Sequence, residues 1–166
     1  LNINDNKIEL AIKRFKGLSH RMEQIYVSKD LEIINDSKST NGESTAAALK
    51  SFNSIFWIVG GKPKDDGIGE AKNFLDKVIE IFIIGDSTNY FSEEITKFNK
   101  DIPLNQCITL EKATKLALKK SKASKLKKCV ILLSPSAASF DQFKNFEDRG
   151  NKFKEIIKSQ LIRGII

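Results

Sequence analysis

The chain of 166 residues carries a formal net charge of +7, and 40% of its residues are hydrophobic while 30% are charged. This balance predicts a globular protein of one domain, argues against a disordered chain, and leaves enough residues to bury a sizeable core. Since no apolar run approaches the roughly 20 residues that cross a bilayer, we expect no membrane partner.

The start of the chain and its cysteines indicate the compartment. Leu1 is not an initiator methionine, so we expect a piece of a longer polypeptide, and no basic-then-apolar leader is visible at this end. Cys107 and Cys129 each lie inside an apolar run, which is typical of small buried hydrophobes rather than of a metal pair. These features predict a protein of the reducing cytoplasm.

The first elements are a helix and a hairpin. Residues 5–15 place apolar side chains at helical spacing, and Gly17 is expected to end that helix. Two short β-like runs follow at 24–28 and 31–35, with a tight turn at Lys29-Asp30. A polar loop and a helix at 43–52 come next.

The rest of the chain alternates between strands and helices. The continuous apolar run at 55–59 is typical of a strand that is buried on both faces of a parallel sheet. We then predict helices and strands in turn: helix 71–78, strand 79–84, helix 90–98, strand 106–110, helix 111–121, strand 130–133 and helix 146–162. The fold class is therefore α/β, a mostly parallel doubly wound sheet with an antiparallel edge hairpin near the N-terminus.

The lysines are spread over most of the chain, with one local cluster from Lys119 to Lys128. A positive charge of this size invites a nucleic-acid hypothesis. The cluster, however, lies at the end of a predicted helix and contains no aromatic residue on which a base could stack. We expect a solvated surface and no nucleic-acid partner.

Residues 35–41, Asn-Asp-Ser-Lys-Ser-Thr-Asn, connect the strand at 31–35 to the helix at 43–52. Ligands of α/β sheets bind outside the carboxyl ends of the strands, which is where this loop lies. Thr40 or Asn41 can cap the helix, and the free N–H groups of a helix start attract anions. A capping loop without a ligand would look the same.

Two further loops follow predicted strands. In Gly60-Gly61-Lys62-Pro63-Lys64 the glycines allow the backbone to approach a ligand and Lys64 can reach over the strand end. In residues 134–143 the hydroxyl groups, with Ser139 among them, suit an anion, whereas Phe143, Phe146 and Phe153 are expected in the core. No stretch has the phosphate-loop pattern Gly-x-x-x-x-Gly-Lys-Ser/Thr.

If the strands are parallel, these three loops meet at one edge of the sheet. They then offer Lys38, Thr40, Lys64 and Ser139 to a shared ligand. Ammonium and hydroxyl groups suit a small carboxylate, because charged donors make the stronger hydrogen bonds.

Four stretches carry a resemblance to a known family: residues 15–21, residues 35–41, Gly60-Gly61 with Lys64, and residues 132–150. Together they resemble the carboxy-terminal domain of a Mur ligase. The run from Ser139 to Phe146, followed by Arg149-Gly150, is similar to the D-glutamate-adding member in particular. The resemblance covers nearly the whole chain and is weakest between Asp86 and Asn105.

The resemblance implies a Rossmann-like domain that closes over a central ATP-binding domain. It assigns D-glutamate binding to Thr40, Lys64 and Ser139, with the backbone of Phe140 and Phe146. It places Arg21 and Asp36 at the nucleotide and gives Lys38 a catalytic position near the reacting phosphates or the glutamate. His20 is expected to have a structural role rather than to act as a catalytic base.

The implied reaction joins D-glutamate to UDP-N-acetylmuramoyl-L-alanine in peptidoglycan synthesis, through an acyl phosphate formed with ATP. Mg²⁺ and most ATP contacts would belong to the central domain, and the UDP site to an amino-terminal domain. Neither domain lies within residues 1–166, for which we expect one domain, no metal ligands, no amide formation in isolation and a monomer.

Two other functions remain open. The chain could be a stand-alone nucleotide- or anion-binding module without catalysis. It could also belong to a related ligase, such as a folylpolyglutamate synthase.

Overall fold

A computed structural model describes residues 4–15, 17–64 and 66–166, so Lys16 of the motif at 15–21 lies outside the described residues. The chain begins with helix α1 (Asp5–Arg14) and the strands β1 (Glu23–Val27) and β2 (Leu31–Asn35). The remaining elements are α2 (Gly42–Lys50), β3 (Ile55–Gly60), the 3₁₀ helix η1 (Gly69–Lys77), β4 (Val78–Ile84), α3 (Thr88–Phe98), β5 (Leu104–Ile108), α4 (Leu110–Ala123), β6 (Cys129–Leu133) and α5 (Phe146–Ile162).

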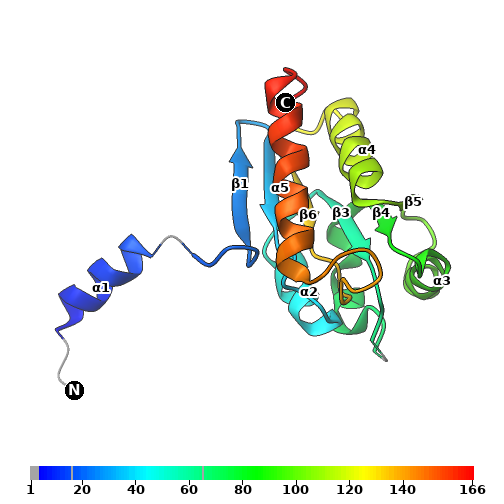
Figure 1. The fold of residues 1–166 in the computed structure, drawn as a ribbon, viewed down its shortest axis with the longest axis horizontal. Coiled ribbons are helices and arrows are strands. Elements are labelled where there is room, and N and C mark those ends of the chain that lie inside the picture. Colours follow the sequence, from blue (N-terminus) through cyan, green and yellow to red (C-terminus); the bar gives the residue numbers. More distant parts are fainter. Residues whose placement is uncertain (1–3, 16, 65) are drawn as a thin grey trace.

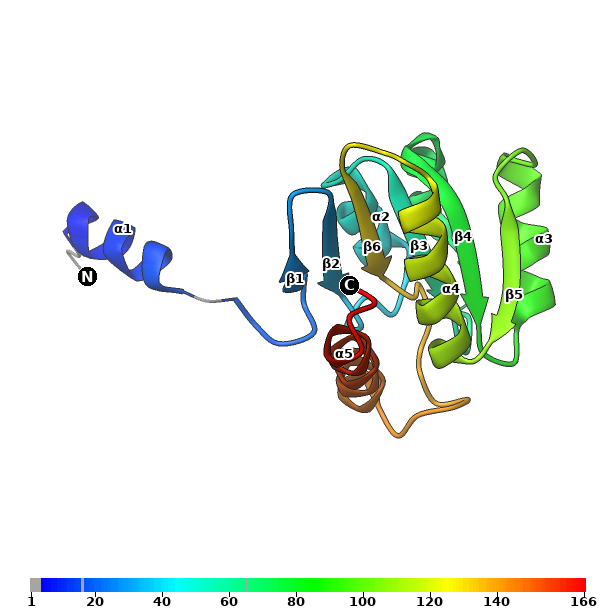
Figure 2. The ribbon, with the colours of Figure 1, turned by 90° about the horizontal axis from the view of Figure 1, so that it is seen from above.

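The strands form one six-stranded sheet in the order β1-β2-β6-β3-β4-β5. β1 pairs with β2 in antiparallel orientation, and the pairs β2–β6, β6–β3, β3–β4 and β4–β5 are parallel. This arrangement confirms the predicted mostly parallel sheet with an antiparallel hairpin at its edge (Figure 2). Consequently, the carboxyl ends of β2, β6 and β3 lie side by side at one edge.

Helices cover both faces of the sheet, as a doubly wound fold requires. Trp57 and Val59 of β3 pack with α2, η1 and α3 on one face. Phe56 and Ile58 of the same strand pack with α4 and α5 on the other face. Because successive side chains of a strand alternate between faces, the apolar run at 55–59 serves two cores.

The segment predicted as a helix at 71–78 is instead the 3₁₀ helix η1, which is kinked at Phe74, and the next strand begins at Val78. The reason is a tertiary contact between η1 and α2. A Cβ added to Gly42 would lie 2.5 Å from the carbonyl oxygen of Ile68, so the two backbones touch. Such close packing constrains the chain at the start of η1 more than helical propensity does.

The strand predicted at 106–110 is also shifted, since β5 ends at Ile108. Thr109 caps α4, and its side chain accepts a hydrogen bond from the N–H of Lys112. Ile108, the last residue of β5, is exposed and has a φ of 65°, a backbone turn that ends the strand there. Leu110 packs in the core as the first residue of the helix rather than as part of the strand.

Helix α1 lies away from the sheet in both views (Figures 1 and 2), and none of its residues is buried. Its predicted helical spacing is confirmed. The side chains of Ile12 and Phe15 remain exposed, so α1 adds nothing to either core.

Both cysteines are free and buried, as predicted, and burial raises the pKa of each thiol. Among the helices of the described residues, none combines the length and the apolar character needed to cross a membrane.

Candidate functional site

Three loops extend from adjacent parallel strands: residues 36–41 after β2, 61–68 after β3 and 134–145 after β6. Because β6 lies between β2 and β3, its loop is flanked by the other two. The predicted meeting of these loops at one edge of the sheet is therefore confirmed (Figure 1).

The loops after β3 and β6 are joined through their backbones. The N–H of Lys62 donates to the carbonyl oxygen of Ala138 at 2.9 Å, and the reverse bond measures 3.0 Å. Gly61 has a φ of 132°, and a Cβ at this position would lie 2.4 Å from the oxygen of Ala138. The glycine pair thus permits the backbone bridge that holds the Lys64 loop beside the Ser139 loop.

Arg149 of α5 joins the loops after β2 and β6. Its Nε donates to Ser37 Oγ at 3.0 Å, its Nη2 to the Ser37 carbonyl at 2.8 Å and its Nη1 to the Ala137 carbonyl at 3.1 Å. The residue is 1% exposed, and burial lowers the pKa of the guanidinium to about 10. It therefore remains a cation at neutral pH.

Arg149 belongs to one of the stretches that carry the family resemblance, but no role was predicted for it. A signal was available in the spacing of α5. Arg149 shares the buried side of that helix with Phe153, Ile156 and Gln160. A charged residue on a buried helical face is expected only where partners satisfy it.

Asp36 is the buried carboxylate of the loop after β2. Its Oδ1 accepts from the N–H of Met22 at 3.0 Å, and its Oδ2 accepts from Ser134 Oγ at 3.0 Å and from Ser39 Oγ. Burial raises the pKa of this carboxyl, and the three donors together with the charge of Arg21 act in the opposite direction.

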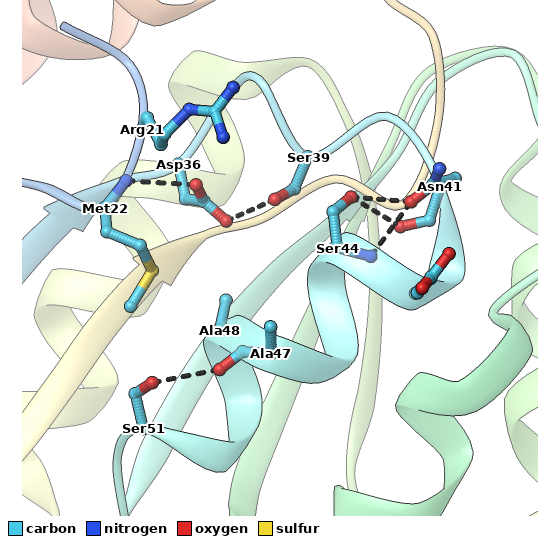
Figure 3. A pocket seen from close by; sticks show the side chains of 10 residues that line it. Arg21, Met22, Asp36, Ser39, Asn41, Ser44, Ala47, Ala48 and Ser51 are labelled. Atoms are coloured by element: carbon cyan, nitrogen blue, oxygen red, sulfur yellow. Dashed lines mark hydrogen bonds between the residues drawn. The ribbon is translucent and has the colours of Figure 1, made fainter. Parts of the chain in front are cut away.

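Arg21 and Asp36, both predicted nucleotide-binding residues, line one cavity of about 540 Å³ (Figure 3). Its other wall is the start and outer side of α2, where the side chain of Asn41 caps the helix by accepting from the N–H of Ser44 at 2.9 Å. The cavity combines a cation, a carboxylate, hydroxyl groups and the apolar surface of Ala47 and Met22, which suits a ligand with both polar and flat apolar parts.

His20 directly precedes Arg21 and Met22, which line this cavity. It is buried, and its φ of 63° turns the chain sharply before Arg21. Its N–H donates to Glu23 Oε2 at 2.9 Å, and the Asn35 side-chain nitrogen lies 3.0 Å from its Nδ1. Burial, followed by the charge of Lys154, lowers the pKa of the imidazole. The predicted structural role of His20 agrees with these contacts.

Lys38 extends above α5 from the loop after β2. Its Nζ lies 4.7 Å from the ring centroid of Phe146, a cation–π contact, and its side chain is exposed. The carbonyl of Phe146 accepts from Ser37 Oγ at 2.8 Å, which ties the start of α5 to the loop after β2.

The expectation that Phe143, Phe146 and Phe153 are all core residues is wrong for Phe146. Phe153 is fully buried and Phe143 packs partly against the core beneath α4 and α5. Phe146 is half-buried beside His20, at 6.3 Å between ring centroids, because it lies at the first position of α5, beyond the sheet.

The remaining predicted ligands differ in exposure. Ser139 is buried, and its carbonyl accepts the N–H of Phe143 at 2.8 Å, whereas Thr40 is half-buried. Lys64 and Phe140 are exposed, the latter at 71%. Within the described residues neither Lys38 nor Lys64 has an acidic partner within 4.0 Å, so this edge presents two uncompensated cations to an anion.

The described part of the chain contains no cluster of three or more histidine, cysteine or acidic side chains that could hold a metal ion. What the edge offers instead is ammonium groups, hydroxyl groups and backbone N–H groups. These are the donors that bind and position carboxylates or phosphates.

No protein-family model matches the chain. The chain is similar to UDP-N-acetylmuramoylalanine–D-glutamate ligase of Rhodopseudomonas palustris strain HaA2, at 38% identity over 157 residues that make up 95% of the chain and 33% of that protein. A second relative of the same name, from Bradyrhizobium diazoefficiens, is 40% identical over 160 residues, which are 96% of the chain and 34% of that protein. The chain thus spans about a third of the length of these relatives.

Among solved structures, the chain is similar to UDP-N-acetylmuramate–alanine ligase of Thermotoga maritima. The TM-score is 0.57 at 13% sequence identity, and the match covers 91% of this chain and 33% of the other. At this identity the likeness concerns the fold alone.

Proposed function

The chain belongs to the Mur ligase family as the counterpart of the carboxy-terminal third of UDP-N-acetylmuramoylalanine–D-glutamate ligases, and from this premise we propose that it is the D-glutamate-binding domain of such an enzyme. The observation that carries the proposal is the joined set of loops at the carboxyl edge of the sheet. Arg149 and the Lys62–Ala138 bridge fix those loops, and Lys38 and Lys64 extend from them.

In the proposed reaction, ATP phosphorylates the carboxylate of UDP-N-acetylmuramoyl-L-alanine, and the amine of D-glutamate attacks the resulting acyl phosphate. ADP is released when the acyl phosphate forms. The tetrahedral intermediate then expels phosphate, and loss of a proton from its nitrogen leaves the amide. The role of this chain is to bind both carboxylates of D-glutamate, with Lys64, Thr40, Ser139 and the backbone of Phe140 and Phe146. Holding a nucleophile in line with its target removes much of the entropic part of a barrier.

Lys38 is the proposed catalytic residue of the chain. Its ammonium is exposed at the same edge and would offset the negative charge of the phosphates and of the forming intermediate. The contact with Phe146 supports this role, because it holds a long flexible side chain above the start of α5.

The cavity beside Asp36 is the proposed contact with the nucleotide. A ribose hydroxyl can donate to the carboxylate, and Arg21 supplies a cation at the mouth. The phosphate loop, the Mg²⁺ ligands and the UDP site would be supplied by central and amino-terminal domains, in a cytoplasmic and monomeric enzyme. We accordingly expect residues 1–166 to fold alone but to form no amide.

The test uses the complete enzyme with Lys64→Ala. Loss of a charged hydrogen bond of about 1.5–3 kcal/mol should raise the KM for D-glutamate by about 10- to 150-fold and leave the KM for ATP nearly unchanged. Lys62→Ala is the matched control, because Lys62 is exposed on the same loop and bridges to Ala138 through its backbone alone. Equal effects of Lys64→Ala on both KM values would remove Lys64 from the glutamate site.

The uncompensated lysines keep a second candidate open, namely an anion-binding module without catalysis. A ligase of the folylpolyglutamate synthase type is a further alternative. Competition between D- and L-glutamate in the complete enzyme separates the alternatives. Preference for the D-isomer supports the proposal, preference for the L-isomer supports the synthase type, and no response to either supports the module.

A further inference from the structure

The positive charge of the chain is concentrated in residues 111–128. This stretch holds eight lysines and a single acid, a net charge of +7 that equals the charge of the whole chain. The other 148 residues contain 20 basic and 20 acidic side chains and are neutral in sum. These lysines were expected to form an ordinary solvated surface, but charge segregation of this degree creates a directed electrostatic field.

The structure places these lysines along the outer side of α4 and the loop that follows it. Ala113, Ala117 and Leu118 face the core, and the exposed lysines at positions 112, 115, 119 and 122 recur at helical spacing on the opposite side. Lys125 and Lys127 continue the stripe to the start of β6. We call residues 111–128 the basic surface.

Most of this charge is not neutralised within the chain. Lys115, Lys120 and Lys128 pair with Glu111, Glu80 and Glu32 at 2.6, 2.9 and 2.6 Å. The other five lysines, at 112, 119, 122, 125 and 127, have no acidic partner within 4.0 Å among the described residues.

The opposite charge lies elsewhere in the fold. Residues 66–101, which include η1 and α3, hold eight acids against four lysines. These two helices pack on the face of the sheet that is opposite to α4. The domain is therefore an electrostatic dipole, and a planar anionic surface would attract the α4 side and repel the other.

Apolar side chains are exposed near the basic surface. The carboxyl ends of α4 and α5 lie at the same end of the molecule (Figure 1), where Ile162 of α5 is 78% exposed and Leu161 is 37% exposed. A cavity of about 380 Å³ on the basic surface is lined by Lys122, Lys125 and Lys127 together with Asp30.

We propose that the basic surface docks the protein on an anionic phospholipid bilayer, with α4 lying along the membrane plane. Clusters of four to eight basic residues on an amphipathic helix bind such surfaces, each lysine contributing roughly fivefold in affinity. This mode is peripheral, and it revises the expectation that no membrane is involved. It does not depend on the proposed ligase activity.

Two observations favour a bilayer over a nucleic acid. The basic surface contains neither arginine nor an aromatic residue, so it lacks the bidentate and stacking groups that read nucleic acids. The exposed aliphatic side chains at the end of α5 gain from the acyl boundary of a bilayer and gain nothing from phosphates in water.

The test measures sedimentation of the complete protein with vesicles at about 0.1 M salt. Vesicles of phosphatidylcholine mixed with phosphatidylglycerol should bind the protein, and pure phosphatidylcholine vesicles should not. Because the attraction is screened beyond a Debye length, binding should fall at least tenfold at about 0.5 M salt. A quadruple variant, Lys→Gln at positions 119, 122, 125 and 127, should lose at least tenfold and as much as several hundredfold in affinity.

A second quadruple variant, Lys→Gln at positions 50, 72, 77 and 100, is the matched control, since it removes the same charge outside the basic surface. It should retain most of the binding. Equal losses in the two variants, or equal binding to neutral vesicles, would overturn the proposal. Binding to duplex DNA with no binding to anionic vesicles, or salt-dependent self-association in place of either, would overturn it as well.

Discussion

Replacing Arg149 with methionine tests whether the hydrogen bonds of Arg149 fix the loops after β2 and β6. The substitution keeps an unbranched stem of similar thickness and removes the donors to the Ser37 and Ala137 carbonyls. The hydroxyl of Ser37 keeps its bond to the Phe146 carbonyl at 2.8 Å. Two buried carbonyl oxygens are then left without this partner.

The expected loss follows from these contacts. Each orphaned acceptor costs about 1–3 kcal/mol, which gives about 2–6 kcal/mol in total. Part of this is offset, because the charge of Arg149 is no longer buried, and that burial is strong enough to lower the pKa of the guanidinium to about 10. We expect the free energy of unfolding to fall by about 2–4 kcal/mol, measured by urea denaturation monitored through Trp57.

The substrate assay separates positioning from stability. In the complete enzyme, at a temperature where the variant is folded, the KM for D-glutamate should rise more than the KM for ATP. The reason is that Ala137 anchors the loop that carries Ser139, and the Lys62–Ala138 bridge ties the loop of Lys64 to it. Lys158→Met is the control, since Lys158 is exposed on the same helix. If the free energy of unfolding of Arg149→Met lies within about 0.5 kcal/mol of the parent value and both KM values are unchanged, Arg149 does not hold the loops.

Two further substitutions probe the neighbouring contacts. Gly150→Ala should lower the free energy of unfolding by about 1–3 kcal/mol, although alanine favours helices, because the added Cβ would lie 2.1 Å from Nδ1 of His20. Calorimetry measures this loss, with Asn151→Ala at an exposed position of the same helix as the control. An increase in the stability of Gly150→Ala would show that the imidazole ring of His20 has room to move. Asp36→Asn tests the raised pKa of Asp36, which means that the folded state binds the proton of this carboxyl more tightly than the unfolded state does. The parent protein should therefore lose stability relative to the variant as the pH rises above the ordinary aspartate value of 3.8. Parallel curves of unfolding free energy against pH, between about pH 3.5 and 6, would contradict this effect of burial.

Much of the fold was predictable because its signals are local. Apolar runs of five residues identify β3 and β6, the mostly apolar run at 31–34 identifies β2, and the helical spacing of α5 gave its bounds, Phe146–Ile162, without error. The polar loop after β2 was visible for the same reason, and Asn41 is one of the two caps, Thr40 or Asn41, that were predicted. Such signals arise from side-chain period and from capping chemistry, which operate within a dozen residues.

The sequence by itself therefore determined the alternation of strands and helices, the polar loops at the strand ends and the residues that these loops carry. The tertiary structure decided the strand order, which places β6 between β2 and β3, the 3₁₀ form of η1 and the role of Arg149. Arg149 and Ser37 are 112 residues apart. Which buried donor meets which acceptor depends on the packing of the whole domain, and no local pattern of side chains encodes that pairing.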